Sequence, residues 1–215
     1  MLKYPLLVIN LKTYAESDIK HAKKIAKAVK DINSDSIILC PENTELGCLK
    51  QEKANLFAQH IDSVEPGAHT GYTLAESVKE NGAIGTILNH SEHKLPIKEL
   101  QKCIKRAKEN NLLTLVCAST PAEAKKIAKF SPAMIAIEPP ELIGGDISVS
   151  TAKPEIITKT IKAVEKVNNI PVLCGAGIKN RDDVQKSIEL GAKGVLVASG
   201  IVKSKSPKRA IKNLI

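Results

Sequence analysis

Eight short apolar runs recur along the 215-residue chain, and they constrain its fold more than any other feature of the sequence. In a strand with one solvent-exposed face, polar and apolar residues alternate. These runs show no such alternation, so they predict strands that are buried on both faces. Amphipathic stretches separate most of them, which is typical of a parallel sheet covered by helices. The expected strands are 5–11, 36–40, 54–59, 83–89, 112–118, 133–138, 170–175 and 193–199.

The stretches between these runs carry apolar residues at helical spacing. In 18–32, for example, Ile19, Ala22, Ile25 and Val29 fall on one face of a helix. The same pattern predicts helices over 96–109, 121–129, 152–167, 180–190 and 202–214, and short ones over 41–52 and 73–80. Strand and helix therefore alternate along the sequence.

Eight such strand–helix units favour closure into a (β/α)8 barrel, and 215 residues is at the small end for that fold. A doubly wound open sheet is the alternative. Against it, no glycine-rich nucleotide-binding fingerprint opens any of the expected helices. No linker or block of like charge divides the chain, so we expect a single domain over 1–215.

The net charge of +9 raises the question of a nucleic-acid partner. Lysines dominate the charge, but they are scattered over helical faces among acidic residues. The chain has two Phe, three Tyr and no Trp to stack on bases. We therefore expect solvated helix faces and no nucleic acid, with a basic field that speeds the capture of an anionic small molecule.

The sequence also bears on cellular compartment. No apolar run approaches the roughly 18–20 residues that a membrane span needs. The N-terminal stretch MLKYPLLVINLK lacks the cleavage site of a signal peptide, so we expect a cytoplasmic protein with no membrane partner.

The chain has five cysteines, an odd number, and no two of them form a C-x-x-C pair. This pattern favours free thiols over disulfides or a zinc site. We expect the thiols of Cys40, Cys117 and Cys174 to be buried.

Polar residues at the ends of the expected strands indicate where a site would form, because the loops after the strands build the active sites of parallel barrels. Asn10 ends the first strand, and Lys12 follows on the same side because side chains alternate with a period of two. A lysine at the barrel mouth offers a fixed positive charge to an anionic substrate. A solvated surface lysine is the alternative.

His90 follows the fourth expected strand and allows three interpretations. It forms an H-x-x-H pair with His93, and His60 and His69 lie on other loops, so a metal site is one possibility. Zinc sites normally gather three or four ligands, and the other histidines do not sit at strand ends in the same way. A hydrogen-bonded core histidine is the second interpretation. We favour the third, a catalytic imidazole at the barrel mouth, and expect no metal.

Glu138 ends the sixth expected strand, where a carboxylate is energetically costly unless something requires it. Pro139 and Pro140 follow, and then Gly144 and Gly145. Prolines fix the backbone after the acid, and glycines allow close approach of backbone N–H groups. The segment is either an ordinary strand-to-helix turn or, as the family resemblance given below implies, a lid.

The seventh and eighth expected strands end in glycine-rich and small residues. They are Gly175, Gly177 and Gly200, with Ala198 and Ser199 beside them. Such residues leave backbone N–H groups open to a phosphate, and barrels commonly bind phosphate after strands seven and eight. Simple turns are the alternative, but their coincidence on the last two strands favours a phosphate site.

Five motifs together resemble the triosephosphate isomerase family, and the short helices resemble its archaeal branch. In order along the chain they are VINLKTY (8–14), ILNHSEH (87–93), AIEPPELIGGD (136–146), CGAGI (174–178) and VASG (197–200). Each is weak alone, but five in order on matching strand ends are highly specific. The resemblance covers essentially the whole chain.

The resemblance implies interconversion of dihydroxyacetone phosphate and D-glyceraldehyde 3-phosphate, in glycolysis and gluconeogenesis, without a cofactor. It implies that Glu138 is the general base and His90 the electrophile. Lys12 would supply positive charge, and Asn10 would help to bind the substrate. A carboxylate base kept from water gains basicity, and an imidazole donor stabilises the oxygen on which charge develops.

The resemblance also implies which residues bind the substrate and how copies of the chain assemble. The remaining substrate-binding set is Leu11, Ile143, Gly144, Gly177, Ala198 and Ser199. The segment GAHTGY (67–72), with Thr70 at its tip, is similar to the loop that reaches a neighbouring subunit's site near Lys12. A homo-oligomer is therefore expected, a tetramer rather than a dimer.

The chain departs from familiar bacterial and eukaryotic members at Leu11 and Glu141, where they have aromatic residues. Two other functions stay open at this point. Another phosphate-binding barrel, a phosphoribosyl isomerase or a phosphosugar synthase, would place a carboxylate on the first strand, where this chain has Asn10 and Lys12. A catalytically silent barrel that binds nucleic acid would not need Lys12, His90 and Glu138 together.

Overall fold

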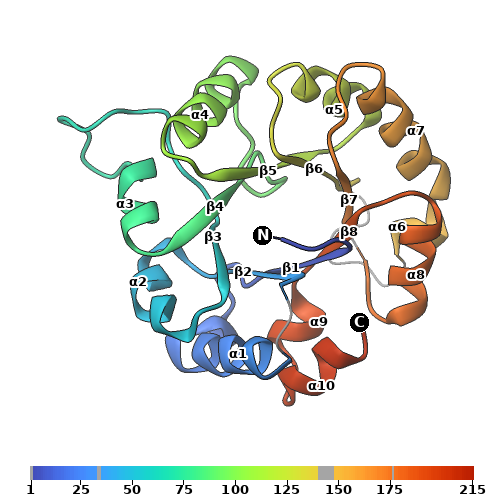
Figure 1. The fold of residues 1–215 in the computed structure, drawn as a ribbon, viewed down its shortest axis with the longest axis horizontal. Coiled ribbons are helices and arrows are strands. Elements are labelled where there is room, and N and C mark those ends of the chain that lie inside the picture. The colour runs from blue at the N-terminus through green and yellow to red at the C-terminus, as the bar shows by residue number, and fades with distance from the viewer. Residues whose placement is uncertain (1, 33–34, 140–147, 176) are drawn as a thin grey trace.

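Eight parallel strands close into a barrel in the computed structural model, which describes residues 2–32, 35–139, 148–175 and 177–215. Each strand pairs with the next along the chain, and helices surround the ring (Figure 1). The expected barrel fold is thereby confirmed. The strands are β1 (Leu6–Asn10), β2 (Ile37–Cys40), β3 (Asn55–Ala58), β4 (Ala83–Leu88), β5 (Leu113–Ala118), β6 (Met134–Ile137), β7 (Val172–Gly175) and β8 (Gly194–Val197).

The barrel closes where β8 pairs with β1, and this pairing requires a glycine. Leu6 is the partner of Gly194 in the register of the two strands. A Cβ atom at Gly194 would lie 2.3 Å from the carbonyl oxygen of Leu6, and the backbone φ of +151° is one that L-residues rarely adopt. A larger residue at position 194 would therefore force the first and last strands apart.

Helices cover the outside of the barrel and connect its strands. They are α1 (Ile19–Ile32), α2 (Leu46–Leu49), α3 (Ala75–Glu80), α4 (Ile97–Glu109), α5 (Pro121–Ala128), α6 (Val149–Ala152), α7 (Pro154–Glu165), α8 (Arg181–Glu189), α9 (Ser199–Val202) and α10 (Pro207–Lys212). Three 3-10 turns add Ala15–Ser17, Asn43–Glu45 and Lys50–Glu52. No helix in the described ranges is long and apolar enough to cross a membrane.

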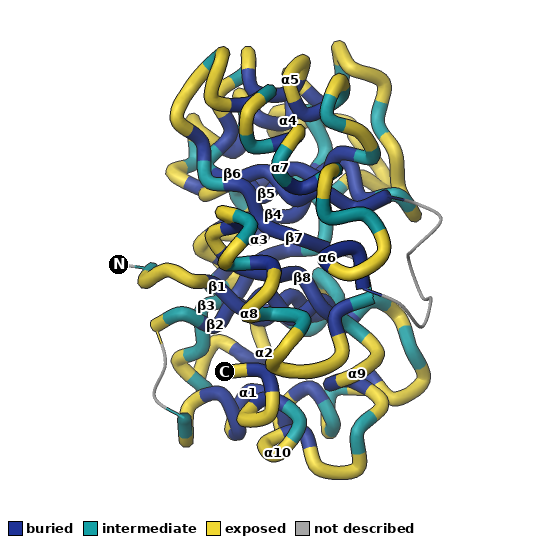
Figure 2. The backbone as a smooth tube through the Cα atoms, turned by 90° about the vertical axis from the view of Figure 1, so that its right-hand side faces the viewer, coloured by how far each residue is buried: buried dark blue, intermediate teal, exposed yellow. Residues whose placement is uncertain are grey.

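The side chains of the strands pack into two apolar cores. One fills the barrel interior and includes Val8, Ile38, Phe57 and Leu115, whereas the larger one lies between the strands and the helices. Figure 2 shows the strands as buried backbone through the middle of the molecule, with exposed segments around them. Since alternate residues of a strand face opposite ways, residues two apart at a strand end continue the inward row towards the barrel mouth.

Several expected helix boundaries were wrong, and prolines explain two of them. The single helix expected over 152–167 is two helices, α6 and α7, with Lys153 in a non-helical conformation between them and Pro154 opening the second. The helix expected over 202–214 begins only at Pro207, which opens α10, and Val202 instead ends α9. Proline suits the first helical position, where it fixes φ and no backbone donor is needed. Ser199, expected in the eighth strand, instead opens α9.

The stretch 41–52 is largely 3-10 turns around the four-residue α2, rather than one short helix. All five cysteines are free thiols, and Cys40, Cys117 and Cys174 are buried as expected. Burial raises the pKa of the Cys174 thiol to about 12, so a neutral thiol is the stable form at neutral pH.

Candidate active site

A cavity of about 370 Å³ opens at the C-terminal ends of the strands. Its lining brings together Asn10 and Lys12 from the end of β1, His90 after β4 and Glu138 after β6. The lining is completed by Tyr14, by residues 177–179 after β7 and by residues 196–200 at the end of β8. The sequence separations are large, but parallel strands bring all of these positions to one end of the barrel.

The backbone of Lys12 is held by two side chains. Its N–H donates to the Asn10 Oδ1 atom at 3.0 Å, and its carbonyl accepts from the Gln59 Nε2 atom at 3.0 Å. Lys12 has a φ of +51°, a conformation that non-glycine residues adopt only when their surroundings enforce it. The buried Asn10 therefore acts on Lys12 by fixing the turn from which the lysine side chain projects.

The ammonium group of Lys12 lies at the cavity wall between two other polar groups. Its Nζ atom is 2.5 Å from the Glu92 Oε1 atom and 6.0 Å from the centroid of the Tyr14 ring. The Lys12 side chain is mostly buried, whereas that of Glu92 is about half exposed. The charge of Lys12 is thus held next to the cavity and balanced from its solvent side.

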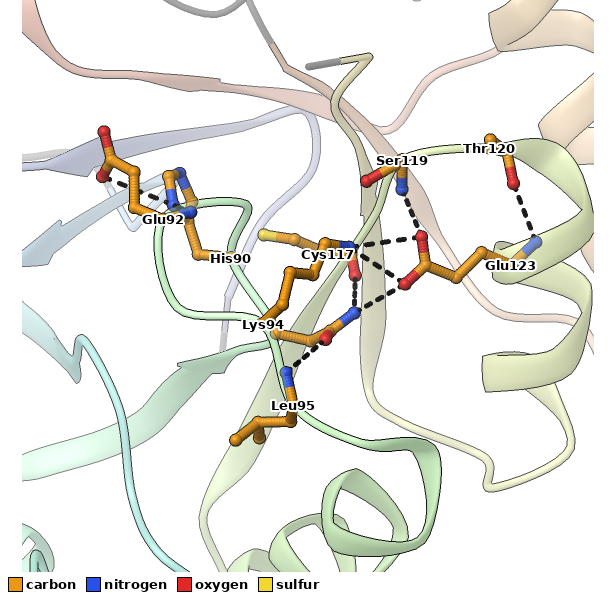
Figure 3. A network of polar contacts seen from close by, with 9 residues as sticks. His90, Glu92, Lys94, Leu95, Cys117, Ser119, Thr120 and Glu123 are labelled. Atoms are coloured by element: carbon orange, nitrogen blue, oxygen red, sulfur yellow. Dashed lines mark hydrogen bonds and ion pairs between the residues drawn. The ribbon is translucent and has the colours of Figure 1, made fainter.

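The two ring nitrogens of His90 have different surroundings. Nδ1 accepts a hydrogen bond from the backbone N–H of Glu92 at 3.2 Å (Figure 3). A nitrogen that accepts in this way carries no proton, so in the neutral ring the proton is on Nε2. Nε2 lies 3.6 Å from the Glu138 Oε2 atom across the cavity. His90 therefore presents an N–H donor to the space beside Glu138.

Glu138 is 5% exposed and follows directly after β6. Its backbone N–H donates to the carbonyl of Ala118 at 2.9 Å, which extends the β5–β6 pairing by one residue. Its Oε2 atom is buried and has no hydrogen-bond partner among the residues that the structure describes. An unsatisfied buried carboxylate oxygen costs about 1–3 kcal/mol, and such exceptions concentrate where chemistry needs them.

Two neighbours shape the space around the Glu138 side chain. A Cβ atom at Gly175, the last residue of β7, would lie 2.6 Å from the Glu138 Cγ atom, so the missing side chain leaves the room that Glu138 occupies. Burial raises the pKa of the Cys117 thiol well above its usual value, and the adjacent Glu138 raises it further. Besides the His90 ring, Glu138 therefore has an uncharged thiol and a glycine backbone as neighbours.

The other end of the cavity is built mainly from backbone. Gly177 has a φ of +73° and lines the cavity together with Ala198, Ser199 and Gly200. The first backbone hydrogen bond of α9 runs from Ile201 N to Ala198 O, so the N–H groups of Ser199 and Gly200 precede it. Such groups at the start of a helix commonly bind anions.

The remaining predicted positions divide into two groups. Leu11 is fully buried, packs in the outer core and is not among the described residues that line the cavity. Ile143 and Gly144 lie outside the described residues. Lys12, His90 and Glu138, by contrast, meet around one cavity.

Two other histidines, His60 and His93, line a neighbouring cavity together with His90. His93 and His60 stack on each other with ring centroids 4.3 Å apart, and His60 Nε2 contacts Asp62 at 3.3 Å. Across the described part of the chain, no three His, Cys, Asp or Glu side chains gather in a way that would hold a metal ion.

Comparison with known proteins gives a direct assignment. The sequence model of the family described as triosephosphate isomerase matches residues 5–214. The chain belongs to the triosephosphate isomerase family. This membership confirms the expected family and the expected class of enzyme, an intramolecular aldose–ketose isomerase.

Curated relatives extend the match over nearly the full length of both sequences. The triosephosphate isomerase of Methanothermus fervidus is 42% identical over 98% of this chain and 97% of its own length. That of Methanobrevibacter smithii is 41% identical over the same shares, and that of Methanocaldococcus jannaschii is 43% identical over 98% of each sequence. These organisms are archaea, which agrees with the archaeal character of the motifs.

Sequence reasoning missed three residues in the site of this triosephosphate isomerase family member. Glu92 contacts both Lys12 and His90, and its place two residues after His90 was an available signal. Gln59 and Cys117 end apolar strands, but nothing in the sequence indicated that they face Lys12 and Glu138. Contacts between residues of different strands can be identified only from the folded barrel, because these residues are far apart in the sequence.

Proposed function

We propose that this member of the triosephosphate isomerase family interconverts dihydroxyacetone phosphate and D-glyceraldehyde 3-phosphate, with Glu138 as the base. The observation that carries the proposal is the pair Glu138 and His90. A Glu138 carboxylate oxygen that has no hydrogen-bond partner among the described residues lies 3.6 Å from an imidazole nitrogen, in a cavity that residues after β7 and β8 also line. The relatives carry the name of this activity.

The reaction needs a proton to leave one carbon and return to its neighbour. Glu138 takes the proton from the carbon next to the carbonyl group, and the electron pair of the broken C–H bond forms the C=C bond of an enediolate. The carbonyl electrons move to oxygen, where the Nε2–H group of His90 donates a hydrogen bond to the developing charge. The His90 imidazole carries the hydroxyl proton from one oxygen of the enediolate to the other, and the protonated Glu138 returns its proton to the adjacent carbon, so no group is consumed.

The substrate phosphate is proposed to bind at the backbone end of the cavity. Gly177, Ser199 and Gly200 line the cavity there, and the carbonyl of Ala198 accepts the first helical bond, so the N–H groups of Ser199 and Gly200 precede that bond. Lys12 supplies positive charge between the phosphate and the reacting carbons. Asn10 fixes the turn of Lys12 and completes the proposed catalytic set with Lys12, His90 and Glu138.

Ile143 and Gly144 remain proposed phosphate contacts from the segment that follows Glu138. No cofactor or metal takes part in the proposed reaction, because the base, the electrophile and the cation are all side chains of the protein. We further propose that the enzyme acts in the cytoplasm, in glycolysis and gluconeogenesis, as one domain over residues 1–215.

The assembly proposed for this protein is a homo-oligomer, a tetramer rather than a dimer. Thr70 is exposed in the single chain, within the segment 67–72 that resembles the family's inter-subunit loop. Light scattering of the purified protein tests this: a mass near that of four 23.1-kDa chains supports the proposal, and a single-chain mass contradicts it.

The direct test of the function is turnover of D-glyceraldehyde 3-phosphate by the purified protein. We expect isomerisation in both directions, competitive inhibition by inorganic phosphate, and far slower turnover of unphosphorylated D-glyceraldehyde because the phosphate contributes binding energy. A folded protein that turns over neither triose phosphate would contradict the proposal.

A further inference from the structure

The residue before His90 is itself unusual. Asn89 joins the end of β4 to His90, is 2% exposed, and has a φ of +58°. Asparagine tolerates the left-handed region better than most residues, but the conformation still costs free energy. A buried amide in such a conformation needs partners for both its oxygen and its nitrogen.

Each polar atom of the Asn89 side chain has a partner, and the partners come from three different segments. Nδ2 donates to the carbonyl of Cys117 in β5 at 2.8 Å and to the Glu123 Oε1 atom in α5 at 2.9 Å. Oδ1 accepts from the backbone N–H of Leu95, just before α4, at 3.0 Å. One side chain thus ties the loop after β4 to the neighbouring strand and helix.

Glu123 is itself fixed, so it is a rigid anchor for Asn89. Its Oε2 atom accepts from the backbone N–H of Ser119 at 2.7 Å, and its Oε1 atom lies 2.9 Å from the Lys94 Nζ atom (Figure 3). Its backbone N–H donates to the Thr120 side chain, which caps α5. Glu123 is therefore held in place by its position in the capped first turn of α5, by the Ser119 N–H group and by the ion pair with Lys94.

The loop closed by Asn89 is the loop that orients His90. Between its two tied ends, the N–H of His93 donates to the carbonyl of His90 at 2.8 Å. The N–H of Glu92 donates to the imidazole Nδ1 atom at 3.2 Å. The direction of the His90 ring therefore depends on the path of the backbone from 89 to 95.

We propose that Asn89 is a positioning residue for His90, and that its amide sets the reach and direction of the Nε2–H group. The proposal rests on the proposed function, since it assigns Asn89 a role in that reaction. Asn89 does not line the cavity and so acts only through His90. If Asn89 had a purely structural role, its substitution would lower stability, and its effect on kcat would not depend on which residue stands at position 90.

The first variant is Asn89→Gly, because glycine keeps the left-handed conformation and removes only the amide. We expect kcat to fall about 10- to 100-fold with KM changed less than about threefold, since a displaced catalytic group loses transition-state stabilisation. The same substitution is then made in a His90→Gln background. There the expected loss in kcat is below about threefold, because no imidazole remains to be positioned.

Asn111→Gly is the matched control, because Asn111 has a φ of +56° but is exposed and lies between α4 and β5, away from the cavity. It is expected to leave kcat unchanged. If Asn89→Gly does not fold, Glu123→Gln takes its place in the same double-mutant cycle, with a smaller loss of kcat that also disappears in the His90→Gln background.

Two results would overturn the proposal: unchanged kcat in Asn89→Gly, or an equal fold-loss in the parent and His90→Gln backgrounds. An inactive parent protein would instead contradict the proposed function itself, so the two failures are distinguishable. A ¹⁵N NMR spectrum of His90 gives an independent signature. We expect the Nδ1 resonance to shift in Asn89→Gly, and an unchanged resonance would also count against the proposal.

Discussion

Two carboxylates near the barrel mouth differ at the scale of single residues. Glu123 accepts hydrogen bonds from a backbone N–H, an amide and an ammonium group. The buried Oε2 atom of Glu138, in contrast, has no partner within the described part of the chain. The first arrangement stabilises the fold, and the second leaves a base ready to take a proton.

Acid should remove the stabilisation that Glu123 provides. Burial opposes ionisation of this carboxyl, but the Ser119 N–H, Lys94 and Asn89 outweigh it and hold its pKa below the ordinary value of 4.5. A folded-state pKa below the unfolded one gives stability that is complete above about pH 4.5 and is lost as the pH falls through the folded value. Glu123→Gln should therefore destabilise the protein by about 1–2 kcal/mol at pH 7, and by progressively less below pH 4.5.

Chemical denaturation of the parent and of Glu123→Gln between pH 3 and pH 7 measures this difference. Glu155→Gln is the control, since Glu155 is an exposed carboxylate in the first turn of α7. A difference between parent and Glu123→Gln that stays constant across this range would show that the charge of Glu123 is not what stabilises the fold.

At the scale of elements, the end of β7 limits where the catalytic base can lie. Gly175→Ala would place a Cβ atom 2.6 Å from the Glu138 Cγ atom and 2.9 Å from its Oε1 atom, so the carboxylate must move. We expect kcat to fall about 10- to 100-fold with little change in KM, because misplacing a reacting group by about 1 Å can cost that much. Steady-state kinetics with D-glyceraldehyde 3-phosphate measure the effect.

Gly85→Ala is a useful comparison within β4. Its Cβ atom would lie 2.5 Å from Phe57 Cζ and 2.7 Å from the carbonyl of Leu113, in the barrel wall. Overpacking there should cost about 1–3 kcal/mol of stability and leave kcat per folded molecule unchanged. If the two alanine variants lost kcat equally, the effect at Gly175 would reflect general strain rather than movement of Glu138.

The elements also show what the sequence could predict. Strands were predictable because a parallel barrel buries both of their faces, and the period of two placed Asn10 and Lys12 together at the end of β1. The break between α6 and α7 was missed because apolar spacing continues across Lys153 and Pro154. Asn89 was missed because its partner Cys117 is 28 residues away, a contact that no local pattern encodes.

At the scale of the whole molecule, the net charge of +9 should act on the rate of substrate capture. The positive electrostatic potential of the protein attracts an anionic substrate, and dissolved salt screens this potential. The Debye length is near 10 Å at an ionic strength of about 0.1 M. We expect kcat/KM to fall several-fold between about 0.02 and 0.3 M NaCl, while kcat stays nearly constant because the reaction inside the cavity is screened less.

Charge variants locate the source of this field. Lys203 lies 4.6 Å from the ring of Tyr14, which lines the cavity, whereas Lys129 lies at the C-terminal end of α5. Lys203→Gln should lower kcat/KM at low salt more than Lys129→Gln does. Equal effects, or a kcat/KM that does not depend on salt, would exclude steering by charges near the site.

The measurement that tests the account most directly compares the parent protein with Glu138→Gln. The amide keeps the shape of the side chain but cannot accept the substrate proton, so kcat should fall by about 100- to 10,000-fold. The free energy of unfolding should be unchanged or higher, because a buried carboxylate, one of whose oxygens has no partner within the described residues, is replaced by a neutral group. Glu155→Gln should retain parental turnover. A Glu138→Gln variant that isomerises triose phosphate at the parental rate would contradict the assignment of Glu138 as the base.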